Sequence, residues 1–493
     1  MGQTAWEHGA KSFEAEGILE LIVFIWNPQI VIPAKRCVSI ALGRDPACRS
    51  LPGSRHSLRS AGMTIWGGML RSGLMTKTCD VIIGGGGMVG LTLGLALARG
   101  GMTVAVADPL PKETVTAAAF DGRVSALAYA AVRMYRALGV WEHLESDAQP
   151  IEDILVTDGG PGRAPSPFSL HFDGAEAGTP LGHIAENRHI RSALFAAVET
   201  APNLTLIAPA SLTGLDAGAH TIRASLSNGE TIEARLAVAA DGRESAMRER
   251  MRIGVVGWDY PQTGIVATVA HEKPHNGVAY EHFLPSGPFA ILPMTPASSS
   301  EAAGQNYFNR SSLVWTERAE LAPRLMALDE AAFNAEIATR FGAHLGRTEA
   351  AGPRWSYPLK FHLARDYVRP RFALAGDAAH GIHPIAGQGL NLGLKDAAAL
   401  AEIVLDAARL GLDFGTLDQL KRYERWRRFD SFALAAATDA LTRLFSNDIA
   451  PLRTLRDLGM GVVDRIGPAR RFFMRHAGGD VGKLPRLMRG EAA

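Results

Sequence analysis

Cysteine is scarce in this chain, which has three cysteines, Cys37, Cys48 and Cys79, among 493 residues. No two of them have the CxxC spacing, so the sequence provides neither a disulfide framework nor a dithiol redox centre. This cysteine usage is typical of a reducing compartment, and we therefore expect a cytoplasmic protein.

An excess of charge of one sign is also missing. The chain carries 51 basic and 50 acidic side chains, which gives a formal net charge of +1. This balance provides no electrostatic basis for nucleic-acid binding, so we expect no nucleic-acid partner. Hydrophobic residues make up 47% and charged residues 20% of the chain. These fractions are ordinary for a soluble globular protein, and the length allows two or three domains.

Long hydrophobic runs are few. The stretch Ile18–Pro33 is apolar, but Glu20 interrupts it, and it is too short to span a bilayer comfortably. Patterned sequence begins only near Thr78. Because the residues before it show neither helix caps nor periodicity, we expect residues 1–74 to be disordered or absent from the natural protein. Three methionines are alternative starts: Met63, Met69 and Met75.

Three glycines open the patterned part of the chain with the spacing GxGxxG: Gly85, Gly87 and Gly90. A short apolar strand precedes them, a helix is expected over Met88–Arg99, and a second strand over Thr103–Ala107 ends at an acidic residue. This strand–helix–strand context is the fingerprint of a dinucleotide-binding unit. The first glycine makes the tight turn, the second admits the pyrophosphate, and the third lets the helix pack on the strand.

Two side chains and two short elements extend this unit. Asp108, at the end of the second strand, is placed to accept hydrogen bonds from ribose hydroxyls. Arg123 follows where it could fold back over a bound nucleotide or form a surface salt bridge. The apolar spacing of Leu127–Leu138 predicts a packed helix, and Ile151–Val156 is expected to form a strand.

Two later segments repeat a buried strand that ends in an Asp/Gly turn. Leu236–Ala240 leads into Asp241 and Gly242, and Phe372–Ala375 leads into Gly376 and Asp377. Open α/β sheets place ligand-binding groups at such strand ends. Each segment alone is compatible with an ordinary strand and turn, and we prefer the ligand-binding interpretation because three such motifs occur in one chain.

A loop rich in glycine and proline follows the last of these turns and leads into a helix expected over Asn391–Ala401. Pro384, Gly387 and Gly389 would let the backbone approach a flat ligand, because glycine has no Cβ to collide with it. The free N–H groups at the start of the helix face the same loop.

Between the second and third motifs, four strand candidates follow one another without an intervening helix. They are Gly264–Ala270, Ala279–Leu284, Phe289–Pro293 and Ser312–Trp315. Consecutive strands separated by turn residues indicate an antiparallel sheet. We expect this sheet to form a second layer and the other wall of a substrate cavity.

Together the three motifs resemble those of the class A FAD-dependent aromatic monooxygenases. The matching segments are Gly85–Gly90 with Asp108, Ala240–Arg243 with Ser245, and Ala375–His380. The segment His383–Gly393, HPIAGQGLNLG, is more specific and resembles the signature of the ubiquinone-biosynthesis hydroxylases of the UbiH/UbiF type. The resemblance covers about Thr78 to Phe445.

This resemblance implies an α/β fold, in which a Rossmann-like FAD-binding domain of the glutathione-reductase type carries an inserted antiparallel-sheet substrate domain and a C-terminal helical region. The expected FAD-binding segments are 76–150, 186–255 and 366–440. The expected substrate-domain segments are 151–185 and 256–365, and the helical tail is expected at 441–493.

The resemblance also implies residue roles. The ADP half of FAD would be held by Gly85, Gly87, Gly90 and Asp108, with Arg123 near the pyrophosphate. Asp241 and Gly242 belong to a motif associated with FAD and NAD(P)H together, and Gly376 and Asp377 would bind the ribityl chain. The isoalloxazine ring would be lined by Pro384, Gly387, Gln388, Gly389, Leu390 and Asn391.

By the same resemblance, NAD(P)H reduces FAD, the reduced flavin and O₂ form a C4a-hydroperoxide, and its distal oxygen passes to the ring of a polyprenylated phenol intermediate of ubiquinone biosynthesis. The cofactor does this chemistry, which explains why the sequence shows no catalytic triad. His380, His383 and Pro384 are the candidate catalytic residues near the flavin, the histidines for proton handling. Their HxxH spacing lacks a third ligand, so we expect no metal site.

Two other functions remain open: an FAD hydroxylase of a soluble aromatic substrate, and a non-catalytic flavin-binding scaffold of a biosynthetic complex. A prenylated substrate lies in the bilayer, so we expect contact with the inner face of the membrane or with a ubiquinone-biosynthesis complex. Apolar and arginine residues interleave over Leu441–His476, as in an interfacial amphipathic segment. A helix packed on the protein's own surface fits the same pattern.

Overall fold

The computed structural model describes residues 77–117, 122–160, 162, 169–297, 306–384, 387–446 and 482–492. The chain divides into two units, Met1–Arg71 and Ser72–Ala493, and every described residue belongs to the second. The predicted extension at 1–74 and most of the predicted tail at 441–493 therefore lie outside the described residues.

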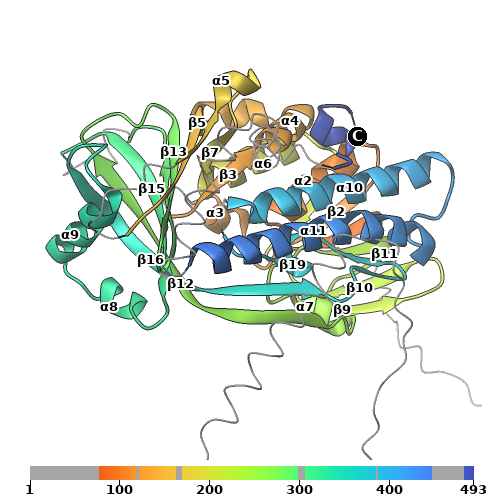
Figure 1. The fold of residues 1–493 in the computed structure, drawn as a ribbon. Helices are drawn as coiled ribbons and strands as arrows, with labels where there is room; N and C mark the ends of the chain where they lie inside the picture. Colours follow the sequence, from red (N-terminus) through yellow and green to blue (C-terminus); the bar gives the residue numbers. More distant parts are fainter. Residues whose placement is uncertain are drawn as a thin grey trace, which may run out of the picture. The chain divides into compact units, whose positions relative to one another are not determined.

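The loops predicted to bind a nucleotide extend from a largely parallel sheet (Figure 1), which has eight strands within the described residues. Its main order is β17–β18–β11–β1–β2–β8, and β10 and β9 continue antiparallel from β11. The strands are β1 (Lys77–Gly84), β2 (Val104–Ala107), β8 (Leu204–Ile207), β9 (Leu212–Ala217), β10 (Ile222–Leu226), β11 (Thr231–Ala239), β17 (Val368–Arg369) and β18 (Phe372–Leu374). All three predicted strand ends lie on the central strands β1, β11 and β18, which run parallel.

The centre of this sheet is apolar throughout. Val81, Ile82 and Ile83 of β1 have no solvent exposure, as expected for a parallel strand that is covered on both faces. Helix α2 (Met88–Arg99) has the predicted bounds, and it packs against α6 (Asn187–Glu199) and α10 (Gly389–Arg409). These helices hold the glycine-rich loops at the strand ends.

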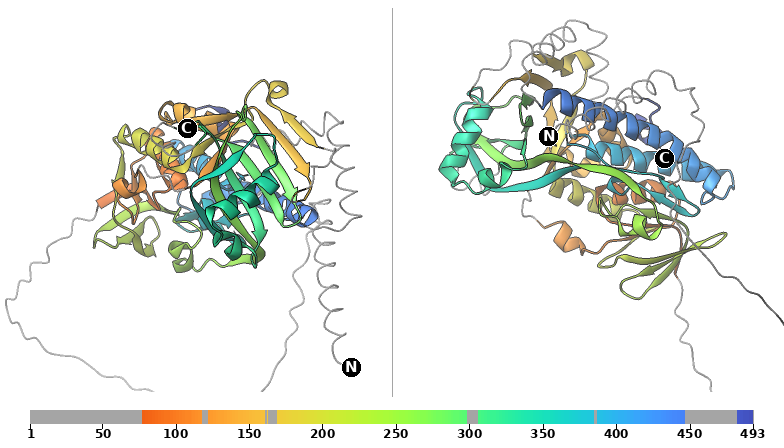
Figure 2. Two further views of the ribbon diagram at one scale, coloured as in Figure 1. Left: turned by 90° about the vertical axis from the view of Figure 1, so that its left-hand side faces the viewer. Right: turned by 60° about the horizontal axis from the view of Figure 1, so that its bottom comes forward.

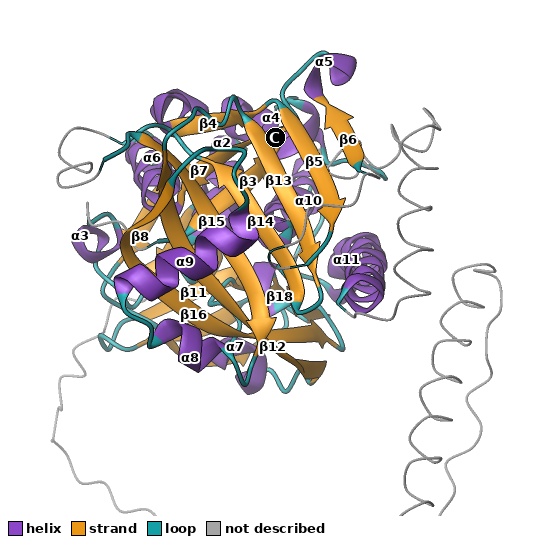
Figure 3. Ribbon diagram, turned by 60° about the vertical axis from the view of Figure 1, so that its left-hand side comes forward, coloured by secondary structure: helices purple, strands orange, loops and turns teal. Residues whose placement is uncertain are grey.

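A second sheet, also of eight strands within the described residues, confirms the predicted antiparallel layer (Figure 3). Its order is β19–β16–β12–β15–β14–β13–β5–β6, and the neighbours are antiparallel apart from the parallel pair β13–β5. The strands are β5 (Asp153–Asp158), β6 (Leu170–Asp173), β12 (Val255–His271), β13 (Val278–Leu284), β14 (Gly287–Pro293), β15 (Asn309–Arg318), β16 (Thr348–Ala364) and β19 (His380–Gly381).

The two faces of the second sheet have different partners. One face carries Ile265, Phe289 and Trp315, which pack on Phe333 and Ile337 of α9. Helix α9 (Glu330–Phe341) and the shorter α8 (Ala322–Met326) cover this face, as Figure 3 shows for α9. Because side chains alternate along a strand, the intervening residues point to the opposite face. The long strands β12 and β16 continue from here toward α7 (Ala246–Arg250) and β19 (Figures 1 and 2).

A small sheet lies between these layers and corrects two predicted elements. It has three strands within the described residues, β3 (Val124–Ala128), β7 (Gly182–Glu186) and β4 (Ala148–Ile151). The predicted helix over Leu127–Leu138 is wrong at its start, because Leu127 pairs with His183 in this sheet and α4 (Tyr129–Ala137) begins later. The predicted strand Ile151–Val156 is two strands, β4 and β5, because its ends join different sheets.

The C-terminal region is helical, as predicted. Helix α11 (Leu417–Phe445) packs along α10 (Figure 1). Residues 482–492 return to the same helices: the Arg486 backbone N–H donates to Glu402 at 2.7 Å, and Trp426 Nε1 donates to the Lys483 carbonyl at 3.0 Å. The described end of the chain therefore packs on the protein itself. None of the helices formed by the described residues is long and apolar enough to cross a membrane.

The strands of the first sheet fall within the predicted segments 76–150, 186–255 and 366–440, although the domain boundaries themselves stay a prediction. The remaining short elements are α3 (Lys112–Val115), α5 (Gly174–Ala177), η1 (Trp141–His143), η2 (Glu145–Asp147), η3 (Gly376–Ala378) and η5 (Arg486–Arg489).

Candidate active site

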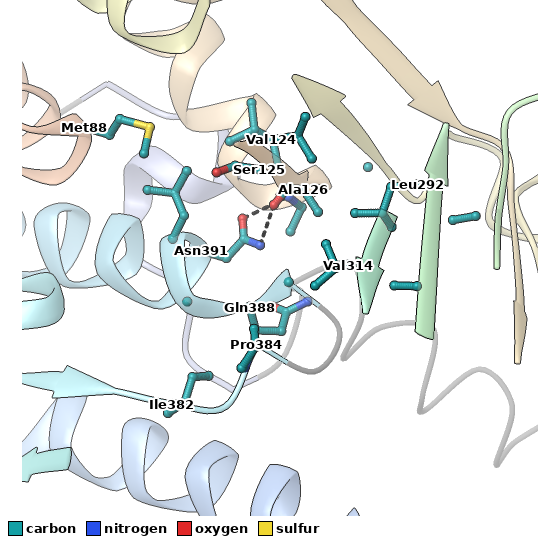
Figure 4. A pocket seen from close by; sticks show the side chains of 18 of the residues that line it. Met88, Val124, Ser125, Ala126, Leu292, Val314, Ile382, Pro384, Gln388 and Asn391 are labelled. Atoms are coloured by element: carbon teal, nitrogen blue, oxygen red, sulfur yellow. Dashed lines mark hydrogen bonds between the residues drawn. The ribbon is translucent and has the colours of Figure 1, made fainter. Parts of the chain in front are cut away.

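A cavity of about 580 Å³ lies where the loops of the first sheet meet the inner face of the second (Figure 4). On one side its wall is formed by the starts of α2 and α10 and by the ends of β11 and β18. The predicted residues that line it are Gly87, Gly242, Asp377, His380, Pro384, Gly387, Gln388, Gly389, Leu390 and Asn391. Residues from all three motifs, far apart in sequence, therefore share one cavity.

The three fingerprint glycines have three different environments. A Cβ on Gly85, whose φ is +105°, would lie 2.3 Å from the Ala240 carbonyl oxygen, so this position requires glycine at a tight turn. A Cβ on Gly90 would lie 1.9 Å from the Gly85 carbonyl oxygen, because helix and strand are in close contact. A Cβ on Gly87 would meet no atom within 4 Å.

Open space beside glycine recurs around the cavity. Cβ atoms on Gly242 and Gly389 would also have no neighbour within 4 Å. These two residues lie on different loops from Gly87, and all three line the cavity. The backbone at Gly87, Gly242 and Gly389 therefore borders open space that side chains would otherwise fill, and we call this part of the wall the glycine cradle. Such a surface fits the pyrophosphate and ring system of FAD.

Asp108 lies at the end of β2 but is not part of the cavity wall. Its Oδ2 accepts a hydrogen bond from the Gly86 backbone N–H at 2.6 Å, and its Oδ1 accepts one from Leu110 at 2.8 Å. The carboxylate therefore fixes the first glycine turn. Asp241 has a similar position after β11, where its Oδ2 accepts from the Met247 backbone N–H at 3.1 Å.

The other predicted residues outside the cavity wall are Gly376, Arg123 and His383, besides Gly85 and Gly90. The side chain of Arg123 is exposed, yet it lies near a residue of the wall. Burial raises the pKa of Tyr357, which lines the cavity, and the charges of Arg243 and Arg123 oppose this increase.

Asn391 uses its side chain to hold the cavity wall together. Its Nδ2 donates to the Ala126 carbonyl at 2.8 Å, and its Oδ1 accepts from the Ala128 backbone N–H at 2.9 Å. Figure 4 shows this residue on α10 beside Ala126, with Leu292 and Val314 across the cavity. Its amide therefore anchors β3 to the start of α10, a role that the motif alone does not indicate.

His380 joins the cavity to a buried ion cluster. Its Nε2 lies 2.6 Å from Asp396 Oδ2, and Asp396 Oδ1 accepts from Arg427 Nε at 2.7 Å. The same carboxylate accepts from the Gly376 backbone N–H at 3.0 Å. Burial alone would raise the pKa of Asp396, but His380 and Arg427 more than compensate and lower it. The cluster thus fixes His380 and the turn before Asp377.

His383 has a different environment from His380. It is buried, and its ring packs edge-on against Tyr260 with centroids 5.1 Å apart. Burial lowers the pKa of His383 to about 4, opposed in part by Asp439, so the imidazole is neutral near pH 7. The two histidines therefore differ: His380 lines the cavity, whereas His383 is buried outside the cavity wall and packs against Tyr260.

The far side of the cavity is an apolar chamber formed by the second and third sheets. Its apolar lining includes Val124, Ile151, Ile154, Val156, Phe172, Leu181, Ala279, Ala290, Leu292 and Val314. A hydrophobic ring or chain could lie here beside the glycine cradle, because the two regions are continuous. One carboxylate, Glu281, interrupts this lining. The sequence alone does not single out this residue, although it is the acidic residue in the largely apolar strand β13.

Comparison with known proteins agrees with this geometry. The family described as FAD binding domain matches residues 78–428. Ubiquinone hydroxylase UbiL of Rhodospirillum rubrum is 50% identical over 423 residues, covering 85% of this chain and 94% of that protein. The 3-demethoxyubiquinol 3-hydroxylase of Escherichia coli is 35% identical over 411 residues, covering 82% of this chain and 99% of that protein.

A solved structure shows the same fold. The p-nitrophenol 4-monooxygenase PnpA of Pseudomonas putida matches with a TM-score of 0.66 at 17% identity, covering 83% of this chain and all of that one (100%). The sequence relatives, the matched FAD-binding family and the glycine cradle agree with one another. The chain belongs to the FAD-dependent monooxygenases that include the hydroxylases of ubiquinone biosynthesis.

Proposed function

We propose that this protein hydroxylates the aromatic ring of a polyprenylated phenol intermediate of ubiquinone biosynthesis, with O₂ as the oxygen source and NAD(P)H as the electron donor. The observation that carries the proposal is the continuity of the glycine cradle with the apolar chamber in one cavity of about 580 Å³. Pockets of this size accommodate small ligands and cofactors. The relatives named as ubiquinone hydroxylases support the choice of substrate.

In this proposal the three motifs divide FAD between them. Gly85, Gly87 and Gly90 hold the pyrophosphate end, where the helix α2 N–H groups favour negative charge. Asp108 fixes the turn next to the adenosine ribose. Gly242 faces the middle of the cofactor, with Asp241 supporting its loop.

The third motif would hold the flavin end. Asp377, which is exposed to the cavity, would accept hydrogen bonds from the ribityl hydroxyls, and Gly376 sets its position. The backbone of Pro384, Gly387, Gln388, Gly389 and Leu390 would lie against the isoalloxazine ring, and Asn391 would hold that wall to β3.

When bound, FAD supplies the two-electron reduction and oxygen activation on which the hydroxylation depends. The chain's own residues position the ring and exclude water. Val124, Leu292 and Val314 provide apolar walls from three different strands. His380 is the residue we propose for proton handling at the flavin, because it lines the cavity and its imidazole is fixed by Asp396.

A substrate with a polyprenyl chain is soluble in lipid, so the protein must collect it from the membrane or from a partner. We propose a cytoplasmic protein that contacts the inner membrane surface or a ubiquinone-biosynthesis complex. Phe429 and Leu444 of α11, with side chains 70% and 40% exposed, support such a contact near the C-terminal region. Flotation of the full chain with anionic vesicles tests the membrane contact.

A comparison of two substrates tests the function. Purified protein is given NADH or NADPH and either a prenylated phenol or the same phenol without its chain, and hydroxylated product is measured by mass spectrometry. The proposal predicts a clear preference for the prenylated phenol. Equal hydroxylation of the two phenols would favour a hydroxylase of soluble aromatics. FAD binding without turnover of either phenol would favour a scaffold.

A matched pair of variants connects turnover to the cradle. Gly87→Val adds a side chain to open space at a φ of −74°, which any residue tolerates, so it should abolish flavin binding while leaving the fold intact. Gly214→Val lies on β9, where a Cβ makes only ordinary contacts with Ser225, and should retain FAD.

A further inference from the structure

Glu281 is a carboxylate on an otherwise apolar cavity wall. In the second sheet it lies opposite Val156 of β5 and Ala290 of β14, and all three residues line the cavity. Its neighbour two positions earlier, Ala279, lines the cavity as well. The alternation of the strand therefore directs the Glu281 side chain toward the chamber rather than toward the α9 core.

The carboxylate has an incomplete set of interactions. Among the described residues it forms no hydrogen bond and no ion pair. Glu281 is partly buried, and its side chain faces the open space of the cavity. A carboxylate between apolar walls is costly unless water or a ligand forms hydrogen bonds with it. A ligand that brings a hydroxyl group into the chamber would supply the missing donor.

We propose that Glu281 is a catalytic residue that accepts the phenol hydroxyl of the aromatic substrate and removes its proton during hydroxylation. This inference rests on the proposed function. It gives the chamber one polar contact for orientation, while the remaining wall contacts the ring and chain.

The proton balance is simple. The phenol O–H bond breaks, the proton moves to a Glu281 oxygen, and the electron pair stays on the phenolate oxygen. Delocalisation of that pair makes the ring carbons ortho and para to it more nucleophilic toward the electrophilic oxygen derived from O₂. When the hydroxylated carbon then loses its hydrogen as a proton, the ring oxygen regains a proton from Glu281, which returns to its starting state. Overall, O₂, NAD(P)H and one proton give the new ring hydroxyl, water and NAD(P)⁺.

The surroundings of Glu281 suit a base that works near neutral pH. Burial raises the pKa of Glu281 to about 7, and a general base is most effective when its pKa lies near the working pH. The titratable groups on its own strand and on β5 are Asp153, Asp158, Tyr280 and His282, and β14 carries none. Those across the cavity are Arg243, Tyr357, Asp377 and His380. The pKa of Glu281 is raised by burial, and none of these charged groups contributes to the increase.

The test compares Glu281→Gln with wild type and with Glu349→Gln. Glu349 lies on β16 of the same sheet but does not line the cavity, so it is the matched control. We expect kcat/KM of wild type and control to rise as pH increases through about 7, and Glu281→Gln to lose this rise together with roughly 10²–10⁴-fold in kcat/KM. A substrate with a more acidic phenol should restore part of the lost rate, whereas Glu281→Asp should keep the pH dependence at reduced rate.

Flavin absorbance and its reduction by NAD(P)H report folding and cofactor binding separately, and both should be unchanged in Glu281→Gln. The inference is overturned if Glu281→Gln is as active as the control with the same pH profile, or if its loss of activity is explained by loss of flavin. Failure of the proposed function would look different, because wild-type protein would then hold FAD and hydroxylate no phenol.

Discussion

The buried cluster of Asp396, His380 and Arg427 predicts a large loss of stability in Asp396→Asn. Asp396 and Arg427 have no solvent exposure, and the carboxylate accepts hydrogen bonds from Arg427, from His380 and from the Gly376 backbone. Asparagine keeps the shape but removes the negative charge, so Arg427 is left buried with Asp430 as its remaining carboxylate.

The magnitude follows from the burial. Removing one partner of a buried ion pair costs about 3–5 kcal/mol, because the other charge stays desolvated. Since Asp430 still pairs with Arg427, we expect a value near the lower limit, about 3 kcal/mol. At 2–4 °C per kcal/mol for large domains, the thermal midpoint should fall by roughly 6–12 °C.

Asp406→Asn is the matched control. Asp406 lies on the same helix, α10, and pairs with Arg486 and Arg409 at a partly exposed site. Exposed pairs contribute about 0–1 kcal/mol, so the control should change the midpoint by about 4 °C or less. Thermal unfolding of the FAD-loaded proteins, followed by circular dichroism and flavin release, measures both. Equal midpoints for the two variants would refute the reasoning.

Three further outcomes follow from other contacts. Because burial raises the Glu281 pKa from 4.5 to about 7, the folded state binds more protons than the unfolded chain in this range, and wild-type stability should fall as pH rises through it. At about 1.4 kcal/mol per pH unit, Glu281→Gln should be more stable than wild type by up to about 3 kcal/mol above this range. The same pH dependence of denaturant unfolding in both proteins would contradict this. Glu186→Gln removes the carboxylate that accepts from the buried Arg310 at 2.8 Å, so the free energy of unfolding should fall by about 3–5 kcal/mol. An unchanged denaturation midpoint would count against it. Leu292→Trp fills the apolar chamber, so KM for a prenylated phenol should rise at least about tenfold, or 1.4 kcal/mol, with unchanged flavin absorbance; an unchanged KM would place the substrate elsewhere.

The sequence predicts much of the fold because the FAD-type motifs are local. Glycine spacing, a buried strand before it and a helix after it are all visible within about thirty residues. Helix α2 has its predicted bounds for the same reason, because it carries its own apolar pattern.

Other features depend on contacts between distant segments, which one sequence does not show. Leu127 fits a helical pattern but lies in a strand, because it pairs with His183 of β7. Asn391 was expected at the cofactor, yet its amide holds β3 through residues more than 260 positions away. Glu281 is a single acidic residue in a strand, and only the sheet register places it on the cavity face.

One measurement tests the central claim most directly. The FAD-loaded protein is supplied with isotopically labelled O₂, NAD(P)H and a prenylated phenol, and the phenol is analysed by mass spectrometry. The continuity of cradle and chamber predicts one labelled oxygen atom on the ring for each NAD(P)H consumed. NAD(P)H oxidation that leaves the phenol unlabelled, with the label found only in peroxide or water, would contradict it.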